Sequence, residues 1–172
     1  MTERFSVILD ETDKKILNLL QLNARMTIKE IAKDVDKGIS TVHNRMKALE
    51  KEKIITGYTA VVDGSKIGRP TVSMVLVRIR YRVPGRRDVI SQREFCLEIA
   101  EHPCVQSVHV LSGEWDVMLK VRTRDVDEMN SFIVDFLRQL PAVDRTLTMF
   151  VMDTYLDTTQ IRIGEKLPKV KK

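Results

Sequence analysis

A short run of hydrogen-bonding and cationic residues near position 40 has the spacing of an exposed helix face. Val42, Met46 and Leu49 recur at i, i+4 and i+7, which predicts that they face a core. The remaining positions suit base edges and phosphates, and they are Lys37, Ser40, Thr41, His43, Asn44, Arg45 and Lys47. This pattern favours contact with double-stranded DNA, although the exposed face of any three-helix domain is also polar.

The helix that presents these residues is predicted to be the third of three. Asp10 or Thr12 caps a first helix, and Thr27 with Glu30 forms a capping box at the start of a second. Residues 36–38 interrupt the helical pattern and predict a tight turn before the third helix. Three short helices with a sharp turn before the last form a helix-turn-helix, here of the winged-helix-like kind.

The rest of the chain alternates strands and helices, which indicates an α+β fold with a second domain. The period of the apolar residues predicts six elements: strands at 71–83, 105–111, 115–121 and 145–156, and helices at 89–101 and 126–140. The order βαββαβ is ferredoxin-like, with an antiparallel sheet covered by helices on one face. Because the other sheet face also carries apolar residues, we expect a homodimer through it.

The chain length and composition fit two small domains. The 172 residues are 43% hydrophobic and carry 29 basic against 24 acidic side chains, a net charge of +5. We expect the following division: a helix-turn-helix domain at 1–63, a linker at 64–70, a ferredoxin-like domain at 71–157, and a basic tail at 158–172. No apolar run approaches the roughly 20 residues of a membrane span, and no signal peptide is recognisable, so we expect a cytoplasmic protein without a membrane partner. No cysteine or histidine spacing indicates a metal, and no cofactor is expected.

Five motifs resemble those of the Lrp/AsnC family of transcriptional regulators, also called feast/famine proteins. They follow the family's order and span nearly the whole chain: LDETDKKIL at 9–17, VHNRMKALE at 42–50, IITGYTA at 54–60, SGEWD at 112–116, and LPAV at 140–143 with Thr148. One departure lies at residues 36–38, where Asp-Lys-Gly stands in place of the family's Gly-hydrophobic-Ser, so that glycine replaces the usual serine cap.

The resemblance implies a transcriptional regulator that binds specific DNA sequences and whose assembly or DNA binding responds to a small metabolite. In the family, such domains bind an amino acid or a related compound between dimers that assemble into tetramers or octamers. The implied effector residues are Gly113, Glu114, Trp115, Asp116 and Thr148. The resemblance also implies that residues 59–63 form a strand linking to a partner subunit, and that residues 71–157 are the effector-binding and oligomerisation domain. It leaves open the role of the arginine-rich segment from Arg78 to Arg87 and of the tail.

Two alternatives remain open from the sequence. The same architecture resembles the sirohaem decarboxylases, in which His and Arg side chains would hold and protonate a tetrapyrrole, and here His109 and Arg122 are the candidates across a hairpin. The chain has no P-loop, GxGxxG or Ser-His-Asp order, and we therefore expect no enzymatic activity. The second alternative is a regulatory binding protein without DNA contact, for which Gly38 at the helix start is the indication.

Overall fold

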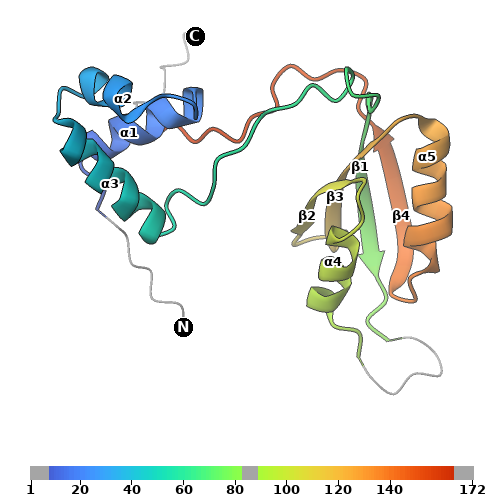
Figure 1. Ribbon diagram of the computed structural model, residues 1–172. Coiled ribbons are helices and arrows are strands. Elements are labelled where there is room, and N and C mark those ends of the chain that lie inside the picture. Colours follow the sequence, from blue (N-terminus) through green and yellow to red (C-terminus); the bar gives the residue numbers. More distant parts are fainter. Residues whose placement is uncertain (1–7, 83–88, 165–172) are drawn as a thin grey trace, which may run out of the picture. The chain divides into compact units, whose positions relative to one another are not determined.

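The protein has two separate hydrophobic cores. The computed structural model describes residues 8–82 and 89–164 (Figure 1). Among the described residues, the first, helical unit comprises residues 8–61 together with residues 156–164. The second, sheet unit comprises Val62–Tyr155. Each unit therefore has its own core.

The helical unit contains α1 (Glu11–Leu22), α2 (Ile28–Asp34) and α3 (Ile39–Lys51). Its core consists of apolar side chains from all three helices: Ile16, Leu17, Leu20, Ile31, Ala32, Val35, Val42 and Leu49. Met46 is half-buried and packs against this cluster. The predicted apolar stripe of the third helix thus faces the core.

Side-chain caps define where the first two helices begin. Asp10 accepts hydrogen bonds from the backbone amides of Thr12 and Asp13, which settles which of the two predicted residues caps α1. The predicted capping box of Thr27 and Glu30 is present at α2. These caps satisfy amide groups that would otherwise lack an acceptor at the start of each helix.

Residues from both ends of the chain contribute to the helical unit. Residues 158–164, predicted to be part of a basic tail, lie along α1 and belong to this unit. Residues 59–63, expected as a linking strand, pair with no other strand in the described chain. A strand needs a neighbour for its backbone hydrogen bonds, and a single chain offers none at this point.

The sheet unit is built on four antiparallel strands in the order β2-β3-β1-β4. The strands are β1 (Thr71–Ile79), β2 (Val105–Val110), β3 (Val117–Thr123) and β4 (Val143–Phe150). With α4 (Gln92–Ala100) between β1 and β2 and α5 (Val126–Ser131) between β3 and β4, the order is βαββαβ. The predicted fold class is confirmed.

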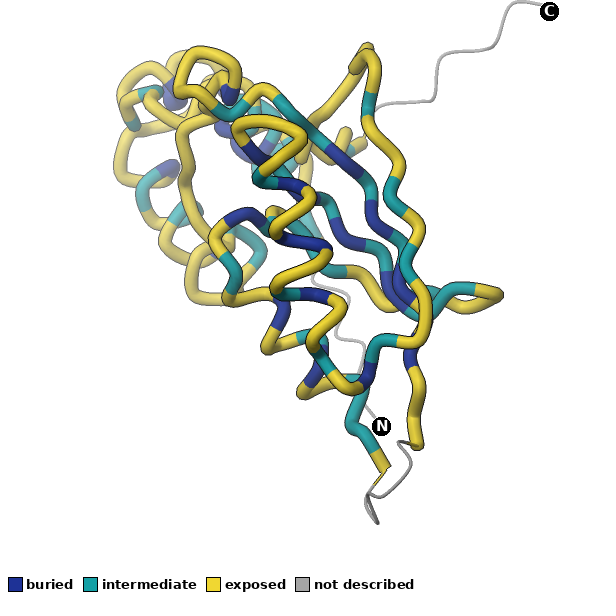
Figure 2. Tube along the Cα trace, turned by 90° about the vertical axis from the view of Figure 1, so that its right-hand side faces the viewer, coloured by how far each residue is buried: buried dark blue, intermediate teal, exposed yellow. Residues whose placement is uncertain are grey.

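The helices cover only one face of this sheet. Buried positions alternate with less buried ones along the strands (Figure 2), and the buried set packs against Phe95 and Ile99 of α4 and against Met129 of α5. Beyond α5, the helical path continues through a π-helical turn, Phe132–Phe136, and a 3₁₀ turn, Leu137–Gln139, rather than as one regular helix.

The opposite face of the sheet remains apolar and partly exposed. The outward positions of three strands carry Met74, Leu76, Met118, Leu147 and Met149. Leu147 and Met149 on β4 are each 43% exposed. Within the sheet unit, no described element covers this face, which is unusual for a sheet with so many large apolar side chains.

β1 is shorter than the sequence predicts. At its end, a side-chain carboxylate replaces a backbone carbonyl as the acceptor for a strand N–H. The backbone N–H of Ile79 donates to Oδ2 of Asp116 at 2.7 Å, and the pairing of β1 with β4 is irregular between Arg78 and Ile79. The strand therefore ends at Ile79 instead of 83. Residues 83–88, and with them Arg86 and Arg87 of the arginine-rich segment, lie outside the described residues.

Candidate DNA interface and effector site

A polar stripe runs along the exposed side of α3. Ser40, Asn44, Lys47 and Lys51 recur at i, i+4, i+7 and i+11, all of them are exposed, and Thr41 flanks them. This spacing places them on one side of the helix, opposite its buried stripe. Hydroxyl and amide groups there can reach base edges in a major groove, while lysines bind phosphate. The i+11 spacing is the signal that adds Lys51 to the predicted set.

The turn before α3 leaves the start of that helix without a side-chain cap. Asp36 adopts a left-handed conformation with φ 53°, and the N–H of Lys37 donates to the carbonyl of Ala32 at 3.0 Å, which closes α2 as a Schellman motif does. Gly38 is the N-cap of α3 and supplies no acceptor. Exposed Lys37 and the uncapped amides of the first turn together favour a phosphate group.

Arg45 differs from the other predicted contact residues. Its Nη1 donates to Oδ1 of Asp13 at 3.0 Å and also to Oδ2 of Asp10. These hydrogen bonds raise the pKa of the Arg45 guanidinium, and a hydrogen bond from the amide of Asp13 leads those that lower the pKa of Asp10. Arg45 therefore joins α3 to α1. In the sequence, the pair of acidic residues at the start of α1 is the feature that could have indicated this contact.

His43 lies half-buried at the edge of the α3 stripe. Beyond the helix, the hydroxyl of Tyr58 donates to Oε1 of Glu50 at 2.8 Å. Burial, followed by this carboxylate, raises the pKa of Tyr58 to about 12. Tyr58 thus fixes the chain that leaves α3 against the last turn of the helix.

The turn between β2 and β3 holds four of the five predicted effector residues. Gly113 has φ 142°, a conformation that side chains rarely adopt, and both Gly113 and Glu114 are exposed. Trp115 is half-buried, with the guanidinium carbon of Arg145 at 5.8 Å from its ring centre. This cation-π contact connects the turn to the edge strand β4.

Asp116 is occupied by contacts within its own domain. Oδ2 accepts from the N–H of Ile79 at 2.7 Å, and Oδ1 accepts from the hydroxyl of Tyr81 at 3.0 Å. Burial, followed by the neighbouring Asp116 carboxylate, raises the pKa of Tyr81. Both carboxylate oxygens therefore already have donors, and Asp116 positions the end of β1.

Thr148 lies apart from the turn on β4. It pairs with Val75 in the register, whereas Arg145, which contacts Trp115, pairs with Arg78. Thr148 lies three positions after Arg145 on the same strand, so the two side chains point to opposite faces of the sheet. The structure brings Trp115 to Arg145 but does not bring Thr148 to the same place.

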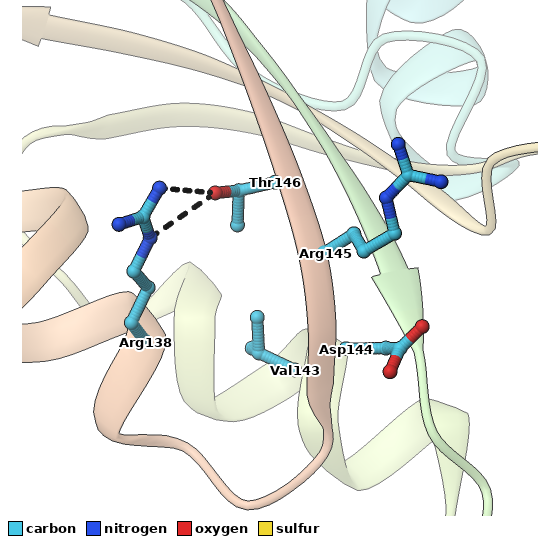
Figure 3. Close-up of a pocket in the computed structure, with 5 residues that line it drawn as sticks. All are labelled: Arg138, Val143, Asp144, Arg145 and Thr146. Carbon is cyan, nitrogen blue, oxygen red and sulfur yellow. Dashed lines mark hydrogen bonds between the residues drawn. The ribbon is translucent and has the colours of Figure 1, made fainter.

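An open pocket of about 410 Å³ lies beside β4 and is lined by Arg138, Val143, Asp144, Arg145 and Thr146 (Figure 3). The guanidinium of Arg138 donates to Oγ1 of Thr146 from two nitrogens, each at 3.4 Å. On the other side of the strand, a hydrogen bond from Arg80 lowers the pKa of Asp144. The cationic lining of this pocket suits a carboxylate group.

The histidine and arginine proposed for tetrapyrrole chemistry do not meet. His109 pairs with Met118 in the register of β2 and β3, and Arg122 lies four residues further along β3. Arg122 donates instead to Gln106 and to the carbonyl of Arg69. The pair suggested for the enzyme alternative is therefore wrong.

Among the described residues, no three His, Cys, Asp or Glu side chains gather in a way that would hold a metal ion. Within the same part of the chain, no helix has the length and apolarity needed to cross a membrane.

The fold and the two candidate sites define a class of protein: a regulator with a DNA-binding helix-turn-helix domain followed by a ligand-binding domain. Residues 9–56 match the winged helix-turn-helix DNA-binding family, and residues 75–161 match the Lrp/AsnC ligand binding domain. The chain belongs to the Lrp/AsnC family and is a DNA-binding transcriptional regulator of that type.

Individual relatives agree over nearly their full length. The HTH-type transcriptional regulator FL11 of Pyrococcus horikoshii is 31% identical over 91% of this chain and 98% of its own. The leucine-responsive regulatory protein of Haemophilus influenzae is 30% identical over 92% of each chain. The crystal structure of the regulator NMB0573 of Neisseria meningitidis in complex with L-Met has a TM-score of 0.81 and 28% identity, over 90% of this chain and 96% of its own. These relatives are regulators, which favours regulation over the decarboxylase alternative.

Proposed function

We propose that this protein binds a roughly palindromic DNA site in the cytoplasm through the polar stripe of α3, as a homodimer or a larger ring of dimers, and that an amino acid modulates this binding. The observation that carries the DNA-binding residues is the exposed row of Ser40, Asn44 and Lys47 on a helix fixed at its inner side. Lys37, Thr41 and His43 border this row and complete the proposed interface.

The DNA contact is tested with Asn44→Ala. An asparagine amide reads adenine through two hydrogen bonds, and one such pair gives about 1–3 kcal/mol of discrimination between bases. We expect the variant to bind the DNA sequences selected by the wild-type protein more weakly. It should also lose part of the preference for these sequences over mutated ones. Fluorescence anisotropy with both DNA sets measures this. Asn130→Ala, at an exposed asparagine within α5, is the matched control. Unchanged discrimination by Asn44→Ala would overturn the assignment.

The dimer is proposed to form through the uncovered face of the sheet. Leu147 and Met149 are partly exposed there beside Met74, Leu76 and Met118, and burying such a patch in a second copy removes apolar surface from water. Leu147→Glu should shift the protein to monomers in analytical ultracentrifugation. Leu97→Glu, at an exposed leucine of α4, should leave the dimer intact. A dimeric Leu147→Glu variant would exclude this face.

The effector site is proposed at the turn of Gly113, Glu114 and Trp115, with Asp116 holding β1 beside it and Thr148 further along β4. A carboxylate would bind Arg145, which lines the β4 pocket and lies against Trp115. Trp115 is the only tryptophan of the chain, so its fluorescence reports on this turn alone. We expect one of the common amino acids, with L-methionine and L-leucine tested first, to change that fluorescence saturably. Thr148→Val should weaken the response, and a full set of amino acids without effect would refute the site.

A further inference from the structure

A segment near the C-terminal end of the chain is bound along α1 by reciprocal hydrogen bonds. Nδ2 of Asn18 donates to the carbonyl of Ile163 at 3.0 Å, and the N–H of Ile163 donates back to Oδ1 of Asn18 at 3.4 Å. One side-chain amide therefore pairs with both backbone groups of one residue, much as a neighbouring β-strand would.

The same arrangement recurs one turn further along α1. Nε2 of Gln21 donates to the carbonyl of Ile161 at 2.9 Å, and the N–H of Ile161 donates to Oε1 of Gln21 at 2.6 Å. Asn18 and Gln21 stand at i and i+3 on the helix, and Ile161 and Ile163 at i and i+2 on an extended chain, so each pair shares one side of its element. Two matched amide pairs are a built contact rather than a chance approach.

Three further contacts complete this docking. Nε2 of Gln160 donates to the carbonyl of Gln21 at 2.9 Å, which satisfies one of the last carbonyls of α1, where a helix leaves such groups unpaired. Ile163 packs against the core of the helical unit. Gly164 has φ 78°, and a Cβ added there would lie 3.1 Å from Cδ of Lys14. The segment therefore runs antiparallel to α1, from Gln21 toward Lys14.

We propose that residues 156–164, here called the C-terminal strap, are a second connection through which the regulatory domain restrains the DNA-binding domain. The first connection is the chain around Val61 and Val62, where the helical unit passes into the sheet unit. The strap returns from β4, the strand that carries Thr148, and ends on α1. A domain held at two points loses orientational freedom that a single flexible linker leaves to it.

This inference rests on the proposed function where it concerns DNA, but the docking itself does not. β4 lines the candidate effector pocket, and the strap begins at Leu156, eight positions after Thr148. A rearrangement at β4 would therefore reach α1 through the strap, and α1 holds α3 through Arg45. The strap gives the effector a route to the DNA-reading helix that bypasses the linker.

Amide hydrogen exchange of the full-length protein tests the docking. In the wild-type protein the amides of Ile161 and Ile163 should exchange slowly because each donates to a side chain of α1. Asn18→Ala combined with Gln21→Ala should speed their exchange at least tenfold and leave α2 unchanged. Lys15→Ala, at an exposed lysine of α1, is the matched control. Equal exchange at both amides in the double variant and the wild-type protein would overturn the docking.

A second variant leaves α1 intact. Ile161→Pro removes the N–H that donates to Gln21, and it should also release the neighbouring amide of Ile163. If the double variant of α1 fails to fold, this proline variant decides the docking alone. Unaltered exchange at Ile163 in Ile161→Pro would contradict a single cooperative strap.

Half-site spacing tests the restraint on orientation. A dimeric reader with fixed domains prefers one spacing of its DNA half-sites, so adding two base pairs between them should weaken wild-type binding. The loss of affinity should be at least threefold smaller for Ile161→Pro, because its DNA-binding domain is held by one connection only. An equal loss in both proteins would refute the restraint. If neither protein bound any DNA, the proposed function would fail, whereas the exchange experiment would still decide whether the strap docks.

Discussion

Nη1 of Arg45 lies 3.0 Å from Oδ1 of Asp13, and this ion pair joins α3 to α1. Asp10, which caps α1, binds the same guanidinium. One arginine thus donates hydrogen bonds to two carboxylates at the start of a helix. The arrangement fixes the rotation of α3 about its axis, and with it the direction in which the stripe of Ser40, Asn44 and Lys47 points.

The first prediction separates Arg45 from the lysines of the same helix. Arg45→Gln should lower the free energy of unfolding by about 1 kcal/mol, the upper end for a partly exposed pair, since it removes contacts with Asp10 and Asp13. Lys47→Gln should leave stability unchanged but reduce the slope of log affinity against log salt by about 1. Denaturant unfolding and salt titrations of DNA binding measure the two effects. The assignment of Arg45 would be contradicted if Arg45→Gln changed only the salt slope.

The second prediction concerns the end of α3. Lys53 has φ 55°, and the N–H of Ile54 donates to the carbonyl of Leu49 across it. Lys53→Gly should stabilise the protein by about 0.5 kcal/mol, because relief of the left-handed strain exceeds the added entropy of the unfolded chain.

Lys51 provides the matched control for this change. It is the last residue of α3, and glycine in helical backbone costs about 1 kcal/mol relative to good helix formers. Thermal unfolding should therefore show a higher Tm for Lys53→Gly and a lower Tm for Lys51→Gly. A lower Tm for both variants would mean that the Lys53 side chain contributes more than its backbone conformation costs.

The third prediction tests the structural role of Asp116. Asp116→Ala leaves the N–H of Ile79 and the hydroxyl of Tyr81 without their acceptor, and an unpaired buried donor costs about 1–3 kcal/mol. We expect destabilisation in that range by chemical denaturation. Glu114→Ala, at an exposed position two residues earlier, should change stability by less than about 0.5 kcal/mol. Equal effects of the two substitutions would show that the Asp116 contacts do not hold β1.

The fourth prediction is the acid sensitivity of the DNA-binding domain. Hydrogen bonds from the backbone and then the hydroxyl of Thr27 hold the pKa of Glu30 below its usual 4.5. A carboxylate with a lowered pKa in the folded state stabilises the fold above its unfolded pKa, and this contribution disappears as the pH falls through the folded value. Glu30→Gln should therefore have a lower Tm than the wild-type protein at pH 7. The difference should shrink below about pH 4.5. A difference in Tm that stayed constant from pH 7 to pH 3 would refute the role of the charge.

The local features of this protein follow from the sequence. The capping box of Thr27 and Glu30, the apolar stripe of Val42 and Leu49, and the βαββαβ order are all present as predicted. They depend on residues a few positions apart, whose side chains must lie on one face or at one helix end. The exposed polar stripe of α3 consists of the helix positions that are left once the buried positions are assigned to the core.

Only the tertiary structure decided which of the candidate residues is engaged elsewhere. Arg45 and Asp116 look available in the sequence, but each meets partners from another element, Asp13 on α1 and Ile79 on β1. The docking of Ile163 on Asn18 joins residues 145 positions apart. Side-chain amides and backbone groups pair wherever geometry allows, so no local period in the sequence records such contacts; they exist only once the chain has folded.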